Sequence, residues 1–251
     1  MQSESEGIRK LSIGSLLLSA VAILMIVAPI AFQQVALSSL SNLIIAGTNS
    51  STTLKSPTLI SFIELSVLLL VISFAIMAIG NLYLSKGFAI LARSGRKVGL
   101  GNIGAVGSFL ASVLLIIGTL LSDVPIITAL HSTDITAALK ADIREVLSGL
   151  AIEVFGILII FIGNILVALG LYKVGDAYDE GRIKMGGISV FLATILTGPL
   201  TLAGGYIFLA SPILFYIGFI STYIGLRKKS RLALRISSAR FTNLSSRARG
   251  N

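Results

Sequence analysis

The sequence predicts an all-α, polytopic membrane protein with six transmembrane helices arranged as three tandem hairpins. Two observations predict this fold class. Hydrophobic residues make up 55% of the 251 residues and charged residues only 12%, which is about half the charged share of an average soluble domain. The charged residues also gather in a few places, and the stretches between them reach the length of about 20 apolar residues that a membrane-spanning helix needs.

Charge-free stretches set the expected bounds of each helix. The last of them, residues 187–226, would measure about 60 Å as one helix at about 1.5 Å per residue, so it must fold back once. Gly204 and Gly205 are the expected turn because they leave about 20 residues on each side. One membrane domain is expected over 1–226, followed by a basic cytoplasmic tail over 227–251. The expected spans are residues 11–32, 62–85, 98–121, 150–172, 186–203 and 206–226.

Basic residues predict the orientation, because loops rich in Lys and Arg stay in the cytoplasm. When the loops are taken alternately, 17 of the 20 basic residues fall on the side that holds both termini, and Lys55, Lys140 and Arg144 fall on the other. We therefore expect a plasma-membrane protein with both termini in the cytoplasm. The outer segment 123–150 has apolar residues at helical spacing and is expected to lie along the membrane surface as an amphipathic helix.

An internal repeat supports the three hairpins. Residues 79–82 read Ile-Gly-Asn-Leu and are followed by Gly87-Phe88, while residues 162–165 read Ile-Gly-Asn-Ile and are followed by Gly170-Leu171. A weaker copy, Ile-Gly-Phe-Ile, occupies residues 217–220. Each copy lies at the expected cytoplasmic end of the second, fourth or sixth helix, so the simplest account is one hairpin repeated three times in the same orientation.

Small residues recur every seven positions in these same three helices. A strict seven-residue repeat keeps one face of a helix turned toward a neighbour, and small residues let helix backbones approach closely in lipid. We therefore expect the second, fourth and sixth helices to pack against one another along these stripes in the middle of the bundle. The stripe residues are Ser66, Ser73, Gly80 and Gly87, then Gly149, Gly156, Gly163 and Gly170, and finally Gly204, Ser211, Gly218 and Gly225.

Three glycine-rich motifs allow a comparison with known families: the repeated Ile-Gly-Asn block, the stretch Gly-Arg-Lys-Val-Gly-Leu-Gly-Asn-Ile-Gly at 95–104, and Tyr-Ile-Gly-Phe-Ile at 216–220. Together they resemble an archaeal family of multi-pass membrane proteins that is grouped only as a domain of unknown function and is best represented in thermoacidophiles. The resemblance covers most of the chain from the second helix onward. It implies a place in the archaeal plasma membrane and brings no catalytic residues to this chain.

Four polar residues in or beside the expected spans are candidates for a polar site. Glu64 and Glu153 are the acids that touch the spans, and a charge within the bilayer is costly enough to suggest function. They are expected near the outer ends, either as interfacial carboxylates or as a proton or cation site in which they face each other across the second and fourth helices. Asn81 and Asn164 are equivalent in the repeat, and they are expected to form interhelical hydrogen bonds, with solute binding as the alternative.

Charges on the expected cytoplasmic side form an acidic cluster in the loop before the fifth helix. Asp176, Asp179 and Glu180 fall within five residues of one another. They are expected to be solvated and balanced by Arg182 and Lys184, and a divalent-cation site is the alternative.

The tail from residue 227 onward contains eight basic residues and no acidic one. Such a cluster beside a membrane favours contact with anionic lipid headgroups. Nucleic acid is not an expected partner, because aromatic residues that could stack on bases are nearly absent from the tail. The expected headgroup residues are Arg227, Lys228, Lys229 and Arg231.

The residue inventory argues against an enzyme and against a metal or cofactor site. The chain has no Cys and one His, His131, and all five Asp are expected in loops, so no nucleophile and base pair is expected. Gly99, Gly101 and Gly104 match the dinucleotide fingerprint by letter but lack the strand that must precede it. We expect a non-catalytic protein that packs with itself or with other membrane proteins. A channel or transporter for a small solute or ion is the alternative.

Overall fold

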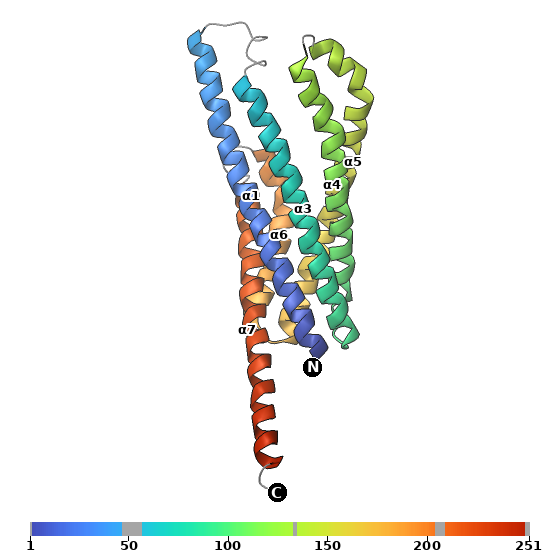
Figure 1. Cartoon of the computed structure of the whole chain (residues 1–251), viewed down its shortest axis with the longest axis vertical. Coiled ribbons are helices and arrows are strands. Elements are labelled where there is room, and N and C mark those ends of the chain that lie inside the picture. Colours follow the sequence, from blue (N-terminus) through green and yellow to red (C-terminus); the bar gives the residue numbers. More distant parts are fainter. Residues whose placement is uncertain (1, 47–56, 133–134, 204–208, 249–251) are drawn as a thin grey trace.

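Long α-helices make up the described part of the chain in this computed structural model (Figure 1). The structure describes the backbone of residues 2–46, 57–132, 135–203 and 209–248, and the side chains of residues 4–27, 57, 60–132, 140, 142–197 and 209–231. The predicted all-α class is confirmed over these residues. The helices are α1 (Gln2–Ala46), α3 (Pro57–Arg93), α4 (Gly99–His131), α5 (Ile135–Ala177), α6 (Gly181–Ala203) and α7 (Ala210–Ala248).

Four of the six described helices are long and apolar enough to cross a membrane, which supports the membrane class. In α6 the described side chains end at Thr197, and in α7 basic residues begin at Arg227. Neither helix therefore contributes a qualifying stretch of described residues. The stretches that qualify are Glu4–Val27 in α1, Ile60–Arg93 in α3, Gly99–His131 in α4 and Asp142–Ala177 in α5.

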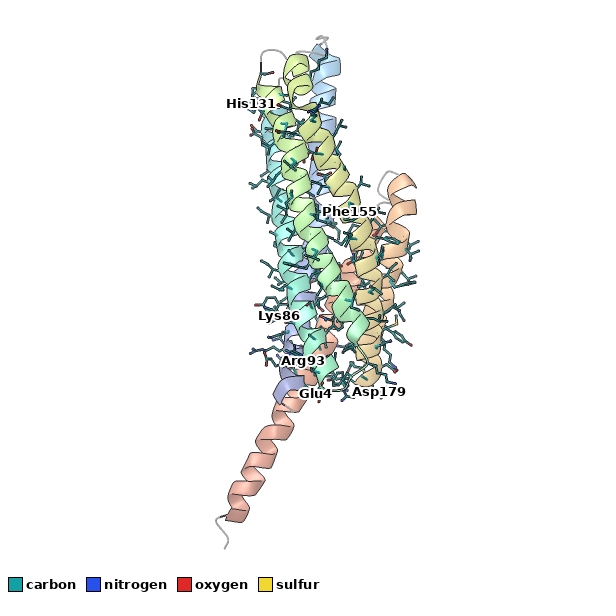
Figure 2. The ribbon with its side chains drawn as sticks, turned by 90° about the vertical axis from the view of Figure 1, so that its right-hand side faces the viewer. Glu4, Lys86, Arg93, His131, Phe155 and Asp179 are labelled. Carbon is teal, nitrogen blue, oxygen red and sulfur yellow. The ribbon has the colours of Figure 1, made fainter. Side chains whose placement is uncertain are left out.

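Large apolar side chains lie on the outside of the bundle. On α5, the side chains of Val154, Phe155, Leu158 and Ile162 are each between 58% and 60% exposed, and Figure 2 labels Phe155 on this helix. A contiguous apolar surface of this kind is rare on a soluble monomer and marks contact with a membrane or a partner. The exposed surface therefore agrees with the length and hydropathy of the helices.

The helices extend past the apolar segments that the sequence predicts. The first residue of α3 is Pro57, which suits the first helical position, and α4 continues to His131, where Ser132 caps it through a 3.1 Å backbone hydrogen bond. Hydropathy marks only the part of a helix that suits lipid, whereas backbone hydrogen bonding continues into polar turns. Because α4 ends at His131 and α5 begins at Ile135, the predicted surface helix over 123–150 is wrong: residues 123–131 complete α4, and residues 135–150 begin α5.

The six helices close into a ring in chain order. Each helix packs against its neighbours in the chain, and α7 packs against α1 to complete the circle. We call the end that holds Glu4, Arg93 and Asp179 the basal end, and the end that holds His131 the distal end (Figure 2). In Figure 1, α6 stops short of the distal end, and α7 continues beyond the basal end.

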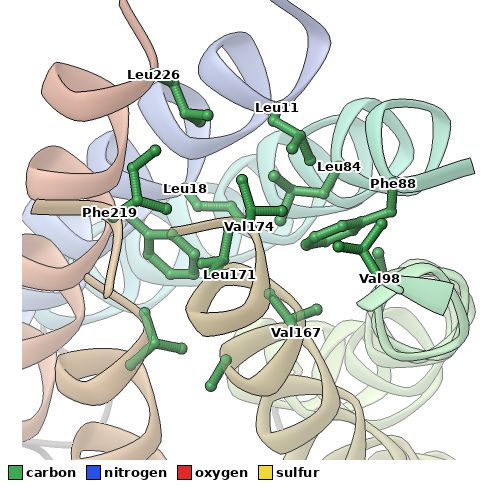
Figure 3. Packing of buried hydrophobic residues seen from close by; sticks show 14 of the residues in the cluster. Leu11, Leu18, Leu84, Phe88, Val98, Val167, Leu171, Val174, Phe219 and Leu226 are labelled. Carbon is green, nitrogen blue, oxygen red and sulfur yellow. The ribbon is translucent and has the colours of Figure 1, made fainter. Parts of the chain in front are cut away.

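Apolar side chains fill the centre of the ring in its basal half. Figure 3 shows them converging from several helices, with Phe88 and Leu84 of α3 opposite Leu171 of α5. These three side chains are 0% exposed. Phe88 also reaches the next helix, because a Cβ added to Gly101 of α4 would lie 2.7 Å from its ring. The ring is therefore packed through its centre as well as between neighbouring helices.

Candidate functional site

Glycines bring the backbones of neighbouring helices into close contact within three pairs: α1 with α3, α4 with α5, and α6 with α7. A Cβ added to Gly14 of α1 would lie 2.7 Å from the backbone oxygen of Gly80 of α3. A Cβ added to Gly104 of α4 would lie 2.5 Å from the backbone oxygen of Gly163 of α5. These distances leave no room for a side chain, so the two backbones touch and supply the packing that helices need in lipid.

The third pair repeats this contact. A Cβ added to Gly186 of α6 would lie 2.7 Å from the backbone oxygen of Gly218 of α7. Gly80, Gly163 and Gly218 hold the same place in the sequence repeat. Each therefore meets a glycine of the helix that precedes it, in α1, α4 or α6.

The predicted packing of the second, fourth and sixth helices against one another along the stripes is wrong. Gly87 of α3 faces Leu11 of α1, Gly225 of α7 faces Ile183 of α6, and Gly170 of α5 faces Gly101 of α4. The stripes therefore contact the first helix of their own pair. In a closed ring each helix has two neighbours, and consecutive elements joined by a short connection usually lie side by side.

Three of the remaining stripe residues, Gly149, Gly156 and Ser211, also contact the first helix of their own pair. Gly149 and Gly156 of α5 face α4, where added Cβ atoms would meet Ser122 and Leu115. Ser211 of α7 donates a hydrogen bond to the backbone oxygen of Ala193 of α6 at 3.0 Å. The hydroxyls of Ser66 and Ser73 bond to carbonyl oxygens of their own helix, each at 2.8 Å. Gly204, together with the predicted turn at Gly204 and Gly205, lies outside the described residues.

The two candidate glutamates do not face each other, so that part of the hypothesis is wrong. Glu64 Oε1 lies 3.6 Å from Nε2 of His131, and both side chains are substantially exposed. Glu153 Oε1 instead accepts a hydrogen bond from Ser122 Oγ at 3.0 Å. Both partners belong to α4, where they are nine residues and therefore about 14 Å apart along the helix axis.

The two candidate asparagines have different surroundings. Asn164 Oδ1 of α5 accepts a hydrogen bond from Ser108 Oγ of α4 at 3.4 Å, as expected for an interhelical contact. Asn81 is 1% exposed, and its Oδ1 has no hydrogen-bond partner among the described residues. Ser15 of α1 is 0% exposed and its hydroxyl is likewise unpaired. The expected hydrogen bond is therefore seen at Asn164 and not at Asn81.

A polar cluster at the basal end joins two connections of the ring to the first turns of α1. Arg96, between α3 and α4, donates from Nε to Glu4 Oε1 of α1 at 3.0 Å. Tyr178, which follows α5, donates to the same oxygen at 3.4 Å, and the Arg96 guanidinium lies 5.0 Å from the centre of its ring. The hydrogen bond to Glu4 raises the pKa of Arg96, and burial raises the pKa of Tyr178.

The acidic loop is only partly solvated. Lys184 Nζ forms an ion pair with Asp176 Oδ1 at 2.8 Å. The hydrogen bond that it donates to Asp176 raises the pKa of Lys184. The Glu180 side chain is 8% exposed and lies 3.4 Å from Lys228 Nζ and 4.0 Å from Lys229 Nζ. Two of the expected headgroup residues therefore also pair with a buried carboxylate, while the headgroup contact itself remains a prediction.

No group of three or more His, Cys, Asp or Glu side chains that could hold a metal ion is found among the described residues. Among these residues, Glu4, Glu6 and Asp176 each form an ion pair with one basic residue, and Glu180 pairs with Lys228 and Lys229. The described polar groups at the basal end thus connect segments of the chain to one another.

Comparison with known proteins supplies a family and no activity. No curated protein and no solved structure matches the chain. A family model with the description "Protein of unknown function (DUF973)" matches residues 4–248, which is almost the whole sequence. This agrees with the resemblance to a family grouped only as a domain of unknown function. The chain belongs to the DUF973 family.

Proposed function

We propose that this protein is a non-catalytic plasma-membrane protein whose three hairpins cross the bilayer six times and form a closed ring that assembles with itself or with other membrane proteins. The proposal depends on how tightly the helices pack in the basal half of the ring. Its centre is filled by side chains such as Phe88 and Leu171, both 0% exposed, and glycines bring its neighbouring helices into backbone contact. Such packing suits a rigid scaffold whose outer apolar surface meets lipid or partner helices.

The ring supports counting α6 and α7 as membrane spans. Both helices take part in the closed circle, between α5 on one side and α1 on the other. A helix that packs along spanning neighbours in this way shares their environment. The connections at the basal end carry Arg96, Lys97 and Arg182, and loops rich in basic residues remain in the cytoplasm. The basal end is therefore the proposed cytoplasmic end, in the plasma membrane that the family resemblance implies.

Anionic lipid headgroups are the proposed partners of the basic residues that begin the tail. Arg227, Lys228 and Arg231 are exposed at the basal end, each close to the proposed membrane surface. Basic residues in such a position gain about 1 kcal/mol each from an anionic leaflet. No nucleic acid partner is proposed.

The orientation can be tested with single cysteines, because the chain has none of its own. Lys97→Cys and Arg182→Cys place a thiol at the basal end, and Lys140→Cys and Arg144→Cys place one at the distal end. A membrane-impermeant maleimide should label only the distal pair in intact cells and all four positions after lysis. Labelling of the basal pair in intact cells would overturn the proposed topology.

The assembly role can be tested by the mass of the purified protein. Native mass spectrometry from lipid nanodiscs should give a mass above that of one 26.3 kDa chain, as a homo-oligomer or as a complex with a co-purified membrane protein. A monodisperse single chain under these conditions would contradict the assembly role.

A channel or transporter is the second candidate, and unpaired polar atoms at the centre of the ring favour it. Ser15 lies three residues before Leu18 on α1, and Asn81 lies three residues before Leu84 on α3, so each shares a helix face with a residue of the central apolar cluster. A solute or water passing through the ring would supply the hydrogen bonds that these two polar side chains lack.

Liposome flux separates the two candidates. Vesicles containing the protein should be no more permeable to protons, potassium or glycerol than empty vesicles, because the apolar cluster closes the centre. Flux above the empty-vesicle control that is lost in Asn81→Leu would favour the channel or transporter instead.

A further inference from the structure

The α4/α5 pair brings two carboxylates to one serine hydroxyl in the distal half of the bundle. Ser122 Oγ lies 3.0 Å from Glu153 Oε1 of α5 and 3.2 Å from Asp123 Oδ1 of α4. The sequence predicts Asp123 in a loop, but α4 continues to His131 and so contains it. A hydroxyl has one hydrogen to donate, so Ser122 cannot satisfy both carboxylates at once.

Two glycines hold Glu153 against Ser122. A Cβ added to Gly118 of α4 would lie 2.6 Å from Glu153 Cγ, and one added to Gly149 of α5 would lie 2.5 Å from the backbone nitrogen of Ser122. The helix backbones are therefore in contact around this position. Ser122 is 0% exposed, so the arrangement is part of the packed interface and not a meeting of mobile surface side chains.

Among the residues that the structure describes, the two carboxylates have no basic partner. None of the ion pairs among the described residues includes Asp123 or Glu153. Both lie in stretches that qualify as membrane spans, Gly99–His131 and Asp142–Ala177. Two negative charges so close together repel each other, and partial burial strengthens the repulsion. A positive charge bound between them would remove this cost.

A buried hydroxyl on the same face of α4 supplies an independent indication of a ligand. Thr119 is 1% exposed, and its Oγ1 has no hydrogen-bond partner among the described residues. It lies three residues before Ser122 and four before Asp123, and residues at these spacings are neighbours on one helix face. Its own backbone oxygen accepts a 3.4 Å hydrogen bond from Ser122 Oγ. An unpaired buried hydroxyl is costly, and a bound cation would give it a ligand role.

We propose that Asp123 and Glu153, together with the hydroxyls of Ser122 and Thr119, bind one divalent cation. Carboxylate and hydroxyl oxygens are ligands for hard cations, and two carboxylates balance a charge of +2. Calcium accepts six to eight oxygens in flexible geometry, including water, whereas magnesium demands a near-ideal octahedron. A site made from one helix pair with four side chains suits calcium better. This site goes beyond the proposed assembly role and does not depend on it.

Calcium binding to the full-length protein in detergent tests the proposal. After removal of metals with a chelator, calcium should raise the Tm of the wild type, with half of the effect on the order of 10⁻⁴–10⁻³ M, the range of extracellular calcium modules. Asp123→Asn and Glu153→Gln should each weaken binding at least tenfold. Glu64→Gln is the matched control, because it removes another distal carboxylate, which pairs with His131, and it should bind like the wild type.

Thr119→Val keeps the shape of the side chain while removing the hydroxyl, so it should fold normally and bind calcium more weakly. Choline chloride at matched ionic strength should not reproduce the calcium effect. The proposal is overturned if the Tm of the wild type does not respond to calcium, if choline chloride stabilises it equally, or if calcium stabilises Asp123→Asn and Glu153→Gln as much as the wild type. None of these measurements depends on membrane orientation, flux or oligomeric mass.

Discussion

The basal and distal halves of the bundle are held together by different kinds of contact. In the basal half α6 and α7 complete the ring, and fully buried residues such as Phe88, Leu84 and Leu171 fill its centre. In the distal half, where α6 stops before the end of the bundle (Figure 1), contacts between helices include polar ones at Glu153 and Glu64. The basal half thus resembles the core of a soluble protein, and the distal half resembles separate helix pairs.

This difference follows from the physics of packing in lipid. An apolar side chain gains little by leaving lipid for a protein interior, so stability must come from close packing and from polar contacts. The basal half uses close packing around a common centre. The distal half leaves carboxylates and hydroxyls available for binding. Substitutions of equal size should therefore have unequal effects in the two halves.

The largest expected effect comes from removing a central aromatic ring at the basal end. Phe88→Ala should lower the free energy of unfolding by about 3 kcal/mol, the lower end of the usual range for Phe to Ala, because in a membrane the loss is mainly that of packing contacts. Thermal or SDS-induced unfolding followed by circular dichroism would measure the change.

Phe155→Ala is the matched control from the distal half of α5. Its side chain is 60% exposed, so the ring contributes little packing within the chain. The two substitutions remove the same atoms, and only their surroundings differ. Equal destabilisation by both would show that the central cluster is not what holds the basal half together.

The second effect concerns the glycine contacts that join α4 to α5. Gly104→Ala should destabilise the protein by about 2 kcal/mol, within the usual range for overpacking, because the new Cβ meets the backbone oxygen of Gly163. Gly107→Ala, one turn further along α4, is the control: its Cβ would have only an ordinary 3.9 Å contact with Ile159. This variant should unfold like the wild type or be up to about 1 kcal/mol more stable, since Ala favours a helix.

Both variants replace a glycine of α4 by alanine, so they differ only in what surrounds the new Cβ. If Gly107→Ala were as destabilising as Gly104→Ala, the cost would lie in helix α4 itself and not in its contact with α5. Unfolding curves for the two variants, recorded in the same detergent, decide between these explanations.

The sequence predicts the all-α class and the long apolar helices, but it does not predict which helices meet. The spacing of Gly80, Gly163 and Gly218 reveals a face of small residues, but a periodic pattern does not name the helix opposite that face. The opposing glycines were present in the sequence as Gly14, Gly104 and Gly186. They do not form a regular stripe of their own, so the sequence did not predict them as the partners of this face.

The sequence predicts only one of the two carboxylates near Ser122, because hydropathy does not show where a helix ends. Glu153 stands out as an acid in an apolar segment. Asp123 does not, because the apolar segment that precedes it ends at Ser122 and hydropathy gives no reason to continue the helix. Backbone hydrogen bonding continues α4 to His131, and this extension places Asp123 beside Glu153 across the helix pair.

The smallest effect is expected when one ion pair is removed from each end of the bundle and the losses of stability are compared. Glu4→Gln at the basal end should cost less than about 1 kcal/mol, because partly exposed ion pairs contribute little. The cost should still be measurable, since Glu4 accepts hydrogen bonds from both Arg96 and Tyr178. Glu64→Gln at the distal end should change stability less, because its 3.6 Å contact is an ion pair only while His131 is protonated.

Salt dependence distinguishes the electrostatic part of these effects from the loss of packing. Between about 0.01 M and 1 M salt the Debye length falls from about 30 Å to about 3 Å, so the difference in Tm between Glu4→Gln and the wild type should shrink over this range. The difference for Phe88→Ala should not shrink, because packing contacts carry no charge. A Glu4→Gln effect that is independent of salt would show that Glu4 joins the basal connections mainly through its shape and neutral hydrogen bonds. In that case both ends of the bundle would depend on packing more than on charge, and the contrast between them would rest on the central apolar cluster alone.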